Sequence, residues 1–130
     1  MNLWIPIRPS RKRRFEIRSV FFITFVKTLT MQILQKSITR AELAALAENT
    51  FGDMIKCVAD VRLGSLALDA ELHADLERLL LENGSAEEDL WGFNLYPEEE
   101  GEDFINPTQD VLDPDIREAI KRLVEQFIIG

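Results

Sequence analysis

Residues 55–70, IKCVADVRLGSLALDA, decide the fold that the sequence predicts. Apolar and polar side chains alternate along most of this stretch, which is typical of strands with one buried face. The inward positions are Ile55, Cys57, Ala59 and Val61, and then Leu66, Leu68 and Ala70. Between the two runs lies the turn Leu63-Gly64-Ser65, in which Gly64 tolerates the positive φ that hairpin turns need. The stretch therefore predicts a β-hairpin.

Helical patterns flank this hairpin on both sides. Upstream, Thr39 and Glu42 have the spacing of a capping box, so a helix is expected over residues 40–49. Downstream, leucines recur at helical spacing from Glu71 onward. That second helix is expected to end at Gly84, where a left-handed C-cap residue belongs.

Two further strands and a third helix complete the pattern. Residues 31–35 predict a short first strand, and residues 91–95 alternate in a strand that stops at Pro97. The last helix begins with the cap residue Asp113 and with Pro114. Its apolar stripe contains Ile116, Ile120, Leu123, Val124, Phe127 and Ile128. The sequence therefore predicts an α+β fold in the order β-α-β-β-α-β-α, with about three helices packed on a small mixed or antiparallel sheet.

Met31 divides the chain into two pieces of opposite charge. Residues 1–30 hold seven basic residues against Glu16 alone, a net charge of +6, so the total of −8 leaves −14 for residues 31–130. The capping box, the alternation and the helical stripes all begin after Met31. We therefore expect one α+β domain over residues 31–130, preceded by a basic extension that is either disordered or an over-extension of a chain that starts natively at Met31.

Composition narrows the classes of function. The 130 residues, 46% of them hydrophobic, suit one domain rather than two. Cys57 is the single cysteine, so an intramolecular disulfide is excluded and we expect a cytoplasmic protein. The acidic body argues against nucleic-acid binding, because affinity for phosphate groups comes largely from Lys and Arg. An acidic surface favours either solubility alone or a partner with a basic surface.

The basic extension raises one alternative, which is attachment to a membrane surface through an amphipathic helix over residues 11–26. The longest uninterrupted apolar run after the basic cluster, residues 20–23, is far shorter than the roughly 20 residues that span a bilayer. Several β-branched residues in the same segment favour strand or disorder over helix. The sequence therefore argues against a membrane partner.

No motif in the chain names a reaction. Neither phosphate-binding glycine pattern is present, and one Cys with one His cannot supply the ligands of a zinc site, so no cofactor or metal is expected. His73 is the only histidine, and with Asp75 and Glu77 nearby it is the candidate for acid–base chemistry in a hydrolase-like enzyme. The competing interpretation is a surface histidine without a catalytic role, and the sequence favours a protein that is not an enzyme.

Two segments favour binding instead. The acidic loop contains Glu98, Glu99 and Glu100, which can dock a basic partner or simply be solvated. Residues 89–97, DLWGFNLYP, place Gly92 and Asn94 on one face of a strand and Trp91 on the other, which predicts either a small polar recess or a core strand anchored by Trp91. The leading hypothesis is a small acidic protein that binds another macromolecule or regulates it. A homodimer through a sheet edge or the last helix is a further expectation.

Five blocks of the sequence together resemble a known family: residues 51–60, 71–75, 79–85 (LLLENGS), 89–97 and 113–120. The family consists of short bacterial and archaeal proteins described only as a domain of unknown function, so the resemblance implies no activity. It covers most of residues 31–130 and none of residues 1–30. Compared with the family pattern, the chain is shortened between Phe104 and Asp113, where a further strand and a turn with basic residues are expected. The resemblance therefore implies that a sheet-edge strand or a basic binding element is lost there.

Overall fold

The structure is a computed structural model that describes residues 31–107 and 111–130, so the predictions for residues 1–30 lie outside it. Its helices are α2 (Arg40–Glu48), α3 (His73–Glu82) and α4 (Pro114–Phe127), with two 3₁₀ turns, η1 (Glu87–Asp89) and η2 (Gly101–Asp103). Its strands are β1 (Gln32–Ile33), β2 (Ile38–Thr39), β3 (Ile55–Asp60), β4 (Ser65–Leu68), β5 (Leu90–Leu95), β6 (Ile105–Pro107) and β7 (Ile128–Ile129).

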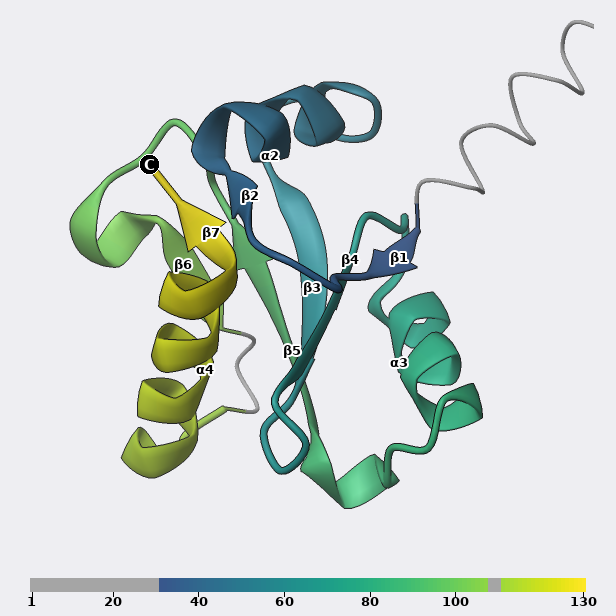
Figure 1. The fold of residues 1–130 in the computed structure, drawn as a ribbon. Coiled ribbons are helices and arrows are strands. Elements are labelled where there is room, and N and C mark those ends of the chain that lie inside the picture. The colour runs from purple at the N-terminus through teal and green to yellow at the C-terminus, as the bar shows by residue number, and fades with distance from the viewer. Residues whose placement is uncertain (1–30, 108–110) are drawn as a thin grey trace, which may run out of the picture.

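The five-stranded sheet is antiparallel and has the strand order β1-β4-β3-β5-β6 (Figure 1). The predicted hairpin forms its centre, because β3 pairs with β4 on one side and with β5 on the other. Gly64 has a φ of +77° in the hairpin turn and donates its amide to the carbonyl of Asp60 at 2.9 Å. The predicted α+β class is therefore confirmed.

Three short strands were not predicted from the sequence. The strands β2 and β7 form a separate parallel pair in which Ile38 lies opposite Ile128. The strand β6 pairs with β5 and forms the edge of the large sheet. Each of the three is only two or three residues long, too short for a period of two to be recognised. The sheet therefore has an edge strand, β6, in the shortened segment after Phe104, where the resemblance implied the loss of either a sheet-edge strand or a basic binding element.

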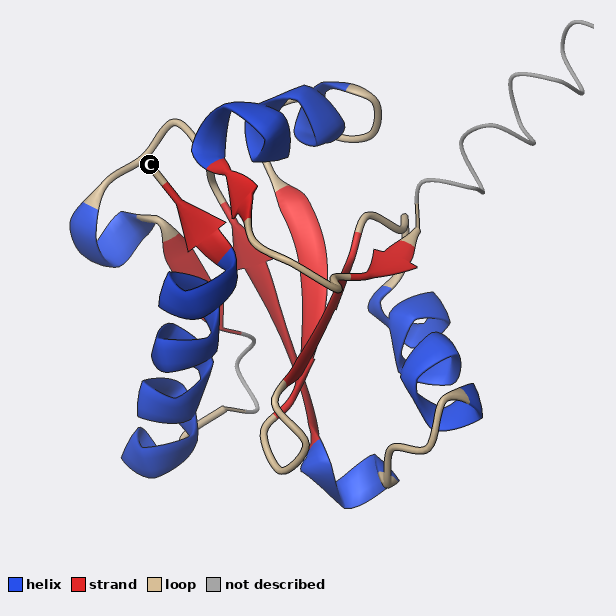
Figure 2. Ribbon diagram, viewed as in Figure 1, coloured by secondary structure: helices blue, strands red, loops and turns tan. Residues whose placement is uncertain are grey.

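Helices cover both faces of the large sheet, with α4 on one side and α3 on the other (Figure 2), and a hydrophobic cluster lies on each face. The larger cluster includes Cys57 and Phe93 together with buried residues of α2 and α4. The smaller cluster includes Val58 together with Leu76 and Leu80 of α3. Both faces of β3 are consequently buried, which explains why Val58 interrupts the predicted alternation.

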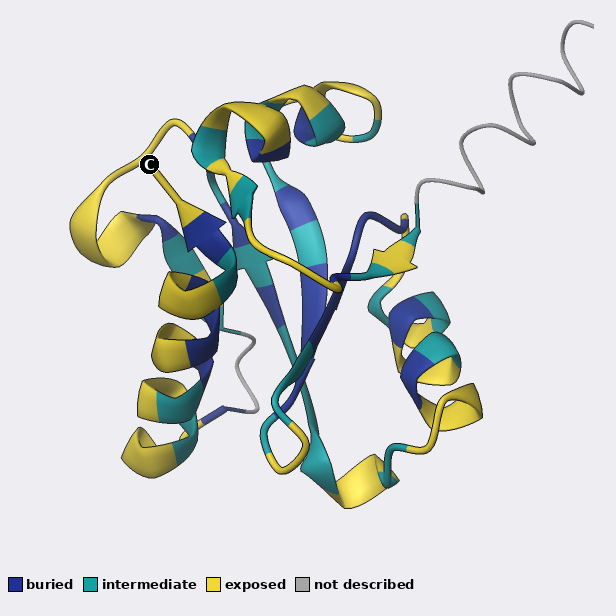
Figure 3. Cartoon of the chain, in the orientation of Figure 1, coloured by how far each residue is buried: buried dark blue, intermediate teal, exposed yellow. Residues whose placement is uncertain are grey.

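The ends of the helices follow the predicted local signals. In α2 the Oγ1 atom of Thr39 accepts from the amide of Glu42 at 3.0 Å, and the Glu42 carboxylate accepts from the amide of Thr39 at 2.8 Å. In α4 the Asp113 carboxylate accepts from the amide of Asp115 at 2.8 Å. The apolar side of α4 is buried against the sheet and its polar side is exposed (Figure 3). Within residues 31–107 and 111–130, no helix is both long and apolar enough to cross a membrane.

Candidate functional site

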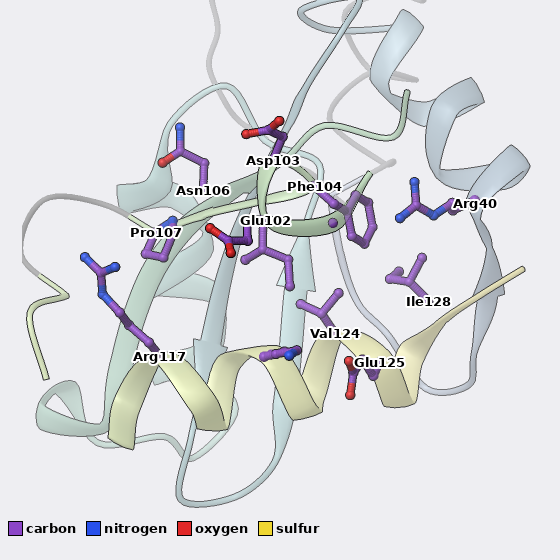
Figure 4. Close-up of a pocket in the computed structure, with 13 residues that line it drawn as sticks. Arg40, Glu102, Asp103, Phe104, Asn106, Pro107, Arg117, Val124, Glu125 and Ile128 are labelled. Carbon is purple, nitrogen blue, oxygen red and sulfur yellow. The ribbon is translucent and has the colours of Figure 1, made fainter. Parts of the chain in front are cut away.

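A groove with a volume of about 820 Å³ lies between α4 and the segment from η2 to β6 (Figure 4). Its apolar lining includes Val124 and Ile128 on the α4 side and Phe104 on the other side, and all three are buried. These three side chains belong to the larger hydrophobic cluster, so the groove opens directly over the core. An apolar base with charged walls is a common form of binding site in proteins.

Charged residues of both signs line the groove. Figure 4 shows Arg117 extending from α4 toward Pro107, whereas Glu125 lies farther along the helix toward Ile128. Lys121 stands between Arg117 and Glu125 on the same helix. Carboxylates also line the opposite wall, where Glu102 and Asp103 belong to η2. The lining therefore holds three cations, Arg40, Arg117 and Lys121, together with the three carboxylates of Glu102, Asp103 and Glu125.

Arg40 fixes the acidic loop that leads into this groove. Its Nη1 atom donates to the carbonyl of Pro97 at 3.0 Å and to the carbonyl of Glu99 at 2.8 Å. Its guanidinium lies 3.7 Å from the centroid of the Phe104 ring, within the range of a cation–π contact. The backbone of the loop is thus held in one conformation, while the side chains of Glu98, Glu99 and Glu100 are exposed.

The sequence contained one signal for the role of Arg40 that the sequence analysis missed. Arg40 is the first residue of α2, where a cation is unfavourable because it meets the positive end of the helix dipole. A basic residue at that position suggests that its side chain is used elsewhere. The tertiary contacts of Arg40 with the acidic loop provide the compensating interactions.

Replacing Arg40 with glutamine is expected to loosen the acidic loop without unfolding the domain. Two hydrogen bonds from a charged donor are lost, which costs about 1.5 kcal/mol and accelerates local opening about tenfold. Hydrogen exchange of the amides of Glu99, Asp103 and Phe104, which donate to loop carbonyls, measures this change. The control is Arg78→Gln, which removes an exposed ion pair with Asp75. Equal exchange in both variants would show that Arg40 does not hold the loop.

Trp91 and Asn94 lie on opposite faces of β5, the arrangement that the sequence analysis expected. Trp91 packs against the larger cluster, whereas Asn94 is in register with Lys56 of β3 and with Asn106 of β6 on the other face. The Oδ1 atom of Asn94 is buried and makes no hydrogen bond among the described residues. The sheet therefore separates Trp91 from Asn94 and its two polar neighbours. Trp91 and Asn94 cannot line one recess together.

His73 is the first residue of α3, and its Nε2 atom lies 3.0 Å from the carbonyl oxygen of Phe93. Because a carbonyl only accepts, we assign a proton to Nε2 in this contact. Asp75 is paired with Arg78 at 3.2 Å, and Glu77 is exposed. No hydrogen bond within the described ranges joins His73 to Asp75 or Glu77. The three residues that the sequence proposed for acid–base chemistry are thus not assembled into one hydrogen-bonded group.

Asp60 is the centre of a buried polar network with a structural role. It is fully buried, and its carboxylate accepts from the amides of Arg62 at 2.9 Å and Leu63 at 2.8 Å and from the hydroxyl of Ser85 at 2.5 Å. Burial by itself raises the pKa of Asp60, but the hydrogen bonds from Leu63, Ser85 and Arg62 outweigh it and hold the pKa below its ordinary value. The network connects the hairpin turn to the end of α3.

Metal binding finds no support in the described residues, which contain no group of three or more His, Cys, Asp and Glu side chains that could hold an ion. Comparison with known proteins gave one result. A family model described as "Protein of unknown function (DUF5674)" matches residues 32–127. Neither a curated protein nor a solved structure matches the chain.

Proposed function

The chain belongs to the family described as "Protein of unknown function (DUF5674)", and from the geometry of its groove we propose that it is a small acidic protein that binds a basic, extended segment of another macromolecule. The observation that carries this proposal is the groove between α4 and η2–β6, whose apolar base is bordered by carboxylates as well as by cations and is continuous with the acidic loop. Clefts of this volume commonly accommodate a ligand or a short peptide segment.

Charge complementarity supports a basic partner. Residues 31–130 carry a net charge of −14, and the acidic loop runs directly into η2, which lines the groove. The loop and η2 together provide five carboxylates, those of Glu98, Glu99, Glu100, Glu102 and Asp103. A field of one sign increases the rate of encounter with an oppositely charged chain and repels chains of like charge.

The rigidity of this acidic surface supports binding rather than solubility alone. A loop that serves only solvation has no need of an anchoring side chain, yet Arg40 stacks on Phe104 and donates to two loop carbonyls. A loop that is ordered before binding loses less conformational entropy when a partner arrives. The acidic loop therefore has the properties of a preorganised binding surface.

A fluorescein-labelled peptide of alternating lysine and serine, with both ends blocked, tests the proposal by fluorescence anisotropy. The groove variant Glu102→Gln/Asp103→Asn/Glu125→Gln is expected to weaken binding about tenfold, because three partly solvated pairs at about 0.5 kcal/mol each are lost. Binding should also weaken as the NaCl concentration is raised from 50 to 500 mM. Salt screens the attraction between charges, and the Debye length is already only about 10 Å at 0.1 M.

The matched control is Glu48→Gln/Glu82→Gln/Glu87→Gln, which removes three exposed carboxylates outside the groove and changes the net charge equally. We expect this control to weaken binding by no more than about twofold, because it changes only the overall electrostatic field of the protein. A third variant, Glu98→Gln/Glu99→Gln/Glu100→Gln, measures how far the surface extends into the acidic loop. If the groove variant and the control lose the same affinity for the peptide, binding depends only on the net charge of the protein, and the groove is rejected as the binding site.

A further inference from the structure

We infer that the groove receives the carboxyl-terminal end of its basic partner, and that Arg117 and Lys121 hold the terminal carboxylate. This inference rests on the proposed function, because it assigns an orientation to the partner that the groove binds. It comes from the two cations of α4 that line the groove, Arg117 and Lys121, which a purely basic segment would leave unused.

Arg117 and Lys121 are two cations of α4 that line the groove and take part in no ion pair among the described residues. The ion pairs among the described residues are Arg62–Asp89, Arg78–Asp75 and Arg122–Glu118. Neither Arg117 nor Lys121 takes part in any of them, although Glu125 follows Lys121 by one helical turn. Two residues four positions apart lie on the same face of a helix, and both of these line the groove. Together they form a local positive site that suits one anionic group.

The guanidinium of Arg117 is already oriented. Its Nε atom donates to the carbonyl of Val111 at 2.7 Å, and Val111 is fully buried in the core. With Nε engaged, the two terminal amino groups remain for a ligand, and a planar carboxylate can accept from such a donor fork. Arg117 is therefore positioned to bind a carboxylate, and Lys121 adds a second charge one turn along the helix.

The spacing along α4 determines where the basic side chains of the partner must be. Arg117 and Glu125 are eight residues apart, which corresponds to about 12 Å along a helix that rises 1.5 Å per residue. An extended chain covers this distance in three to four residues of about 3.3 Å each. A lysine or arginine three or four positions before the terminal carboxylate would therefore meet Glu125. The groove fits a partner chain whose last few residues combine these two charges.

The test uses two labelled peptides that both end in Lys-Ser-Lys-Ala-Ser-Ala and differ only in a free acid or an amide at the C-terminus. Wild-type protein is expected to bind the free acid about tenfold more tightly than the amide. The amide lacks the negative charge that accepts hydrogen bonds from Arg117 and Lys121, and the loss of one such interaction weakens binding by about this factor. In Arg117→Gln/Lys121→Gln this preference should fall to within about twofold. Arg78→Gln/Arg122→Gln removes the same charge from exposed positions outside the groove and should keep the preference.

The outcomes separate this inference from the proposed function. Equal binding of acid and amide to wild-type protein would overturn the carboxylate site and leave a basic partner in the groove. An acid preference that persists in Arg117→Gln/Lys121→Gln would also overturn it. If neither the acid nor the amide binds, and the blocked lysine–serine peptide does not bind either, the proposed function itself fails. Far-ultraviolet circular dichroism of each variant verifies that the fold is retained.

Discussion

The variant Asp60→Ala is expected to lose about 3 kcal/mol of unfolding free energy, because the amides of Arg62 and Leu63 lose a charged acceptor inside the protein. The hydroxyl of Ser85 loses its acceptor as well. For a domain of this size the loss corresponds to a decrease in Tm of more than about 10 °C. Urea unfolding followed by circular dichroism measures it.

Two milder variants show whether the loss of unfolding free energy comes from the hydrogen-bond network of Asp60 or from the smaller volume of the alanine side chain. Asp60→Asn keeps an oxygen acceptor for the two amides and should cost about half as much as alanine. Ser85→Ala removes a single donor and should cost about 1 kcal/mol. If Asp60→Ala and Ser85→Ala were equally stable, the turn amides would not depend on the carboxylate.

The pH dependence of stability has a sign that follows from the lowered pKa of Asp60. The burial of this carboxyl opposes its charge, and the hydrogen bonds to the carboxylate more than compensate, so the folded protein binds this proton more weakly than the unfolded chain does. The stabilisation is therefore present above the ordinary pKa of about 4 and is lost as pH falls through the lower folded value. The difference in stability between wild type and Asp60→Asn should shrink over that acidic range.

Alkylation of Cys57 by iodoacetamide at pH 8 is expected to be at least about a thousandfold slower in the folded protein than in 6 M urea. Cys57 is fully buried in β3. Burial raises the pKa of its thiol well above the ordinary value, and the negative charge of Asp69 raises it further. Reaction thus requires opening of the core, which a stability of 5 kcal/mol or more makes correspondingly rare.

This reaction also reports on the Asp60 network independently of spectroscopy. If Cys57 reacts only through global unfolding, Asp60→Ala should accelerate its alkylation about a hundredfold, in proportion to the lost stability. Mass spectrometry over time gives both rates, and the urea-unfolded proteins serve as the common reference. Native Cys57 that reacts as fast as in urea would contradict its placement in the core.

The long elements of the fold were predictable because their patterns are local. The alternation over residues 55–70 specified the β3–β4 hairpin, and the apolar stripe after Pro114 specified α4. The capping box at Thr39 placed the start of α2 at the observed residue. Each signal depends only on neighbours along the chain, so its physical cause is contained in the sequence.

Only part of the candidate site could be predicted from the sequence, because its remaining residues come together through contacts between distant segments. The acidic loop was identified from its composition, but its anchor Arg40 is 57 residues away from the Pro97 carbonyl that it contacts. Arg117 and Lys121 look like ordinary exposed residues of an amphipathic helix until β6 is placed beside α4. Trp91 and Asn94 were assigned to the correct faces, yet only the pairing of β5 with β3 and β6 shows which residues each one meets.

By itself, the sequence determined the α+β class, the three helices, the central hairpin and the acidic character of the domain. These properties follow from periodicity, capping and charge, which act over a few residues or over the whole composition. The tertiary structure alone decided the sheet order β1-β4-β3-β5-β6, the parallel pair β2–β7 and the groove between α4 and β6. Pairings between distant segments depend on which surfaces bury the most apolar area together, and no local pattern encodes that competition.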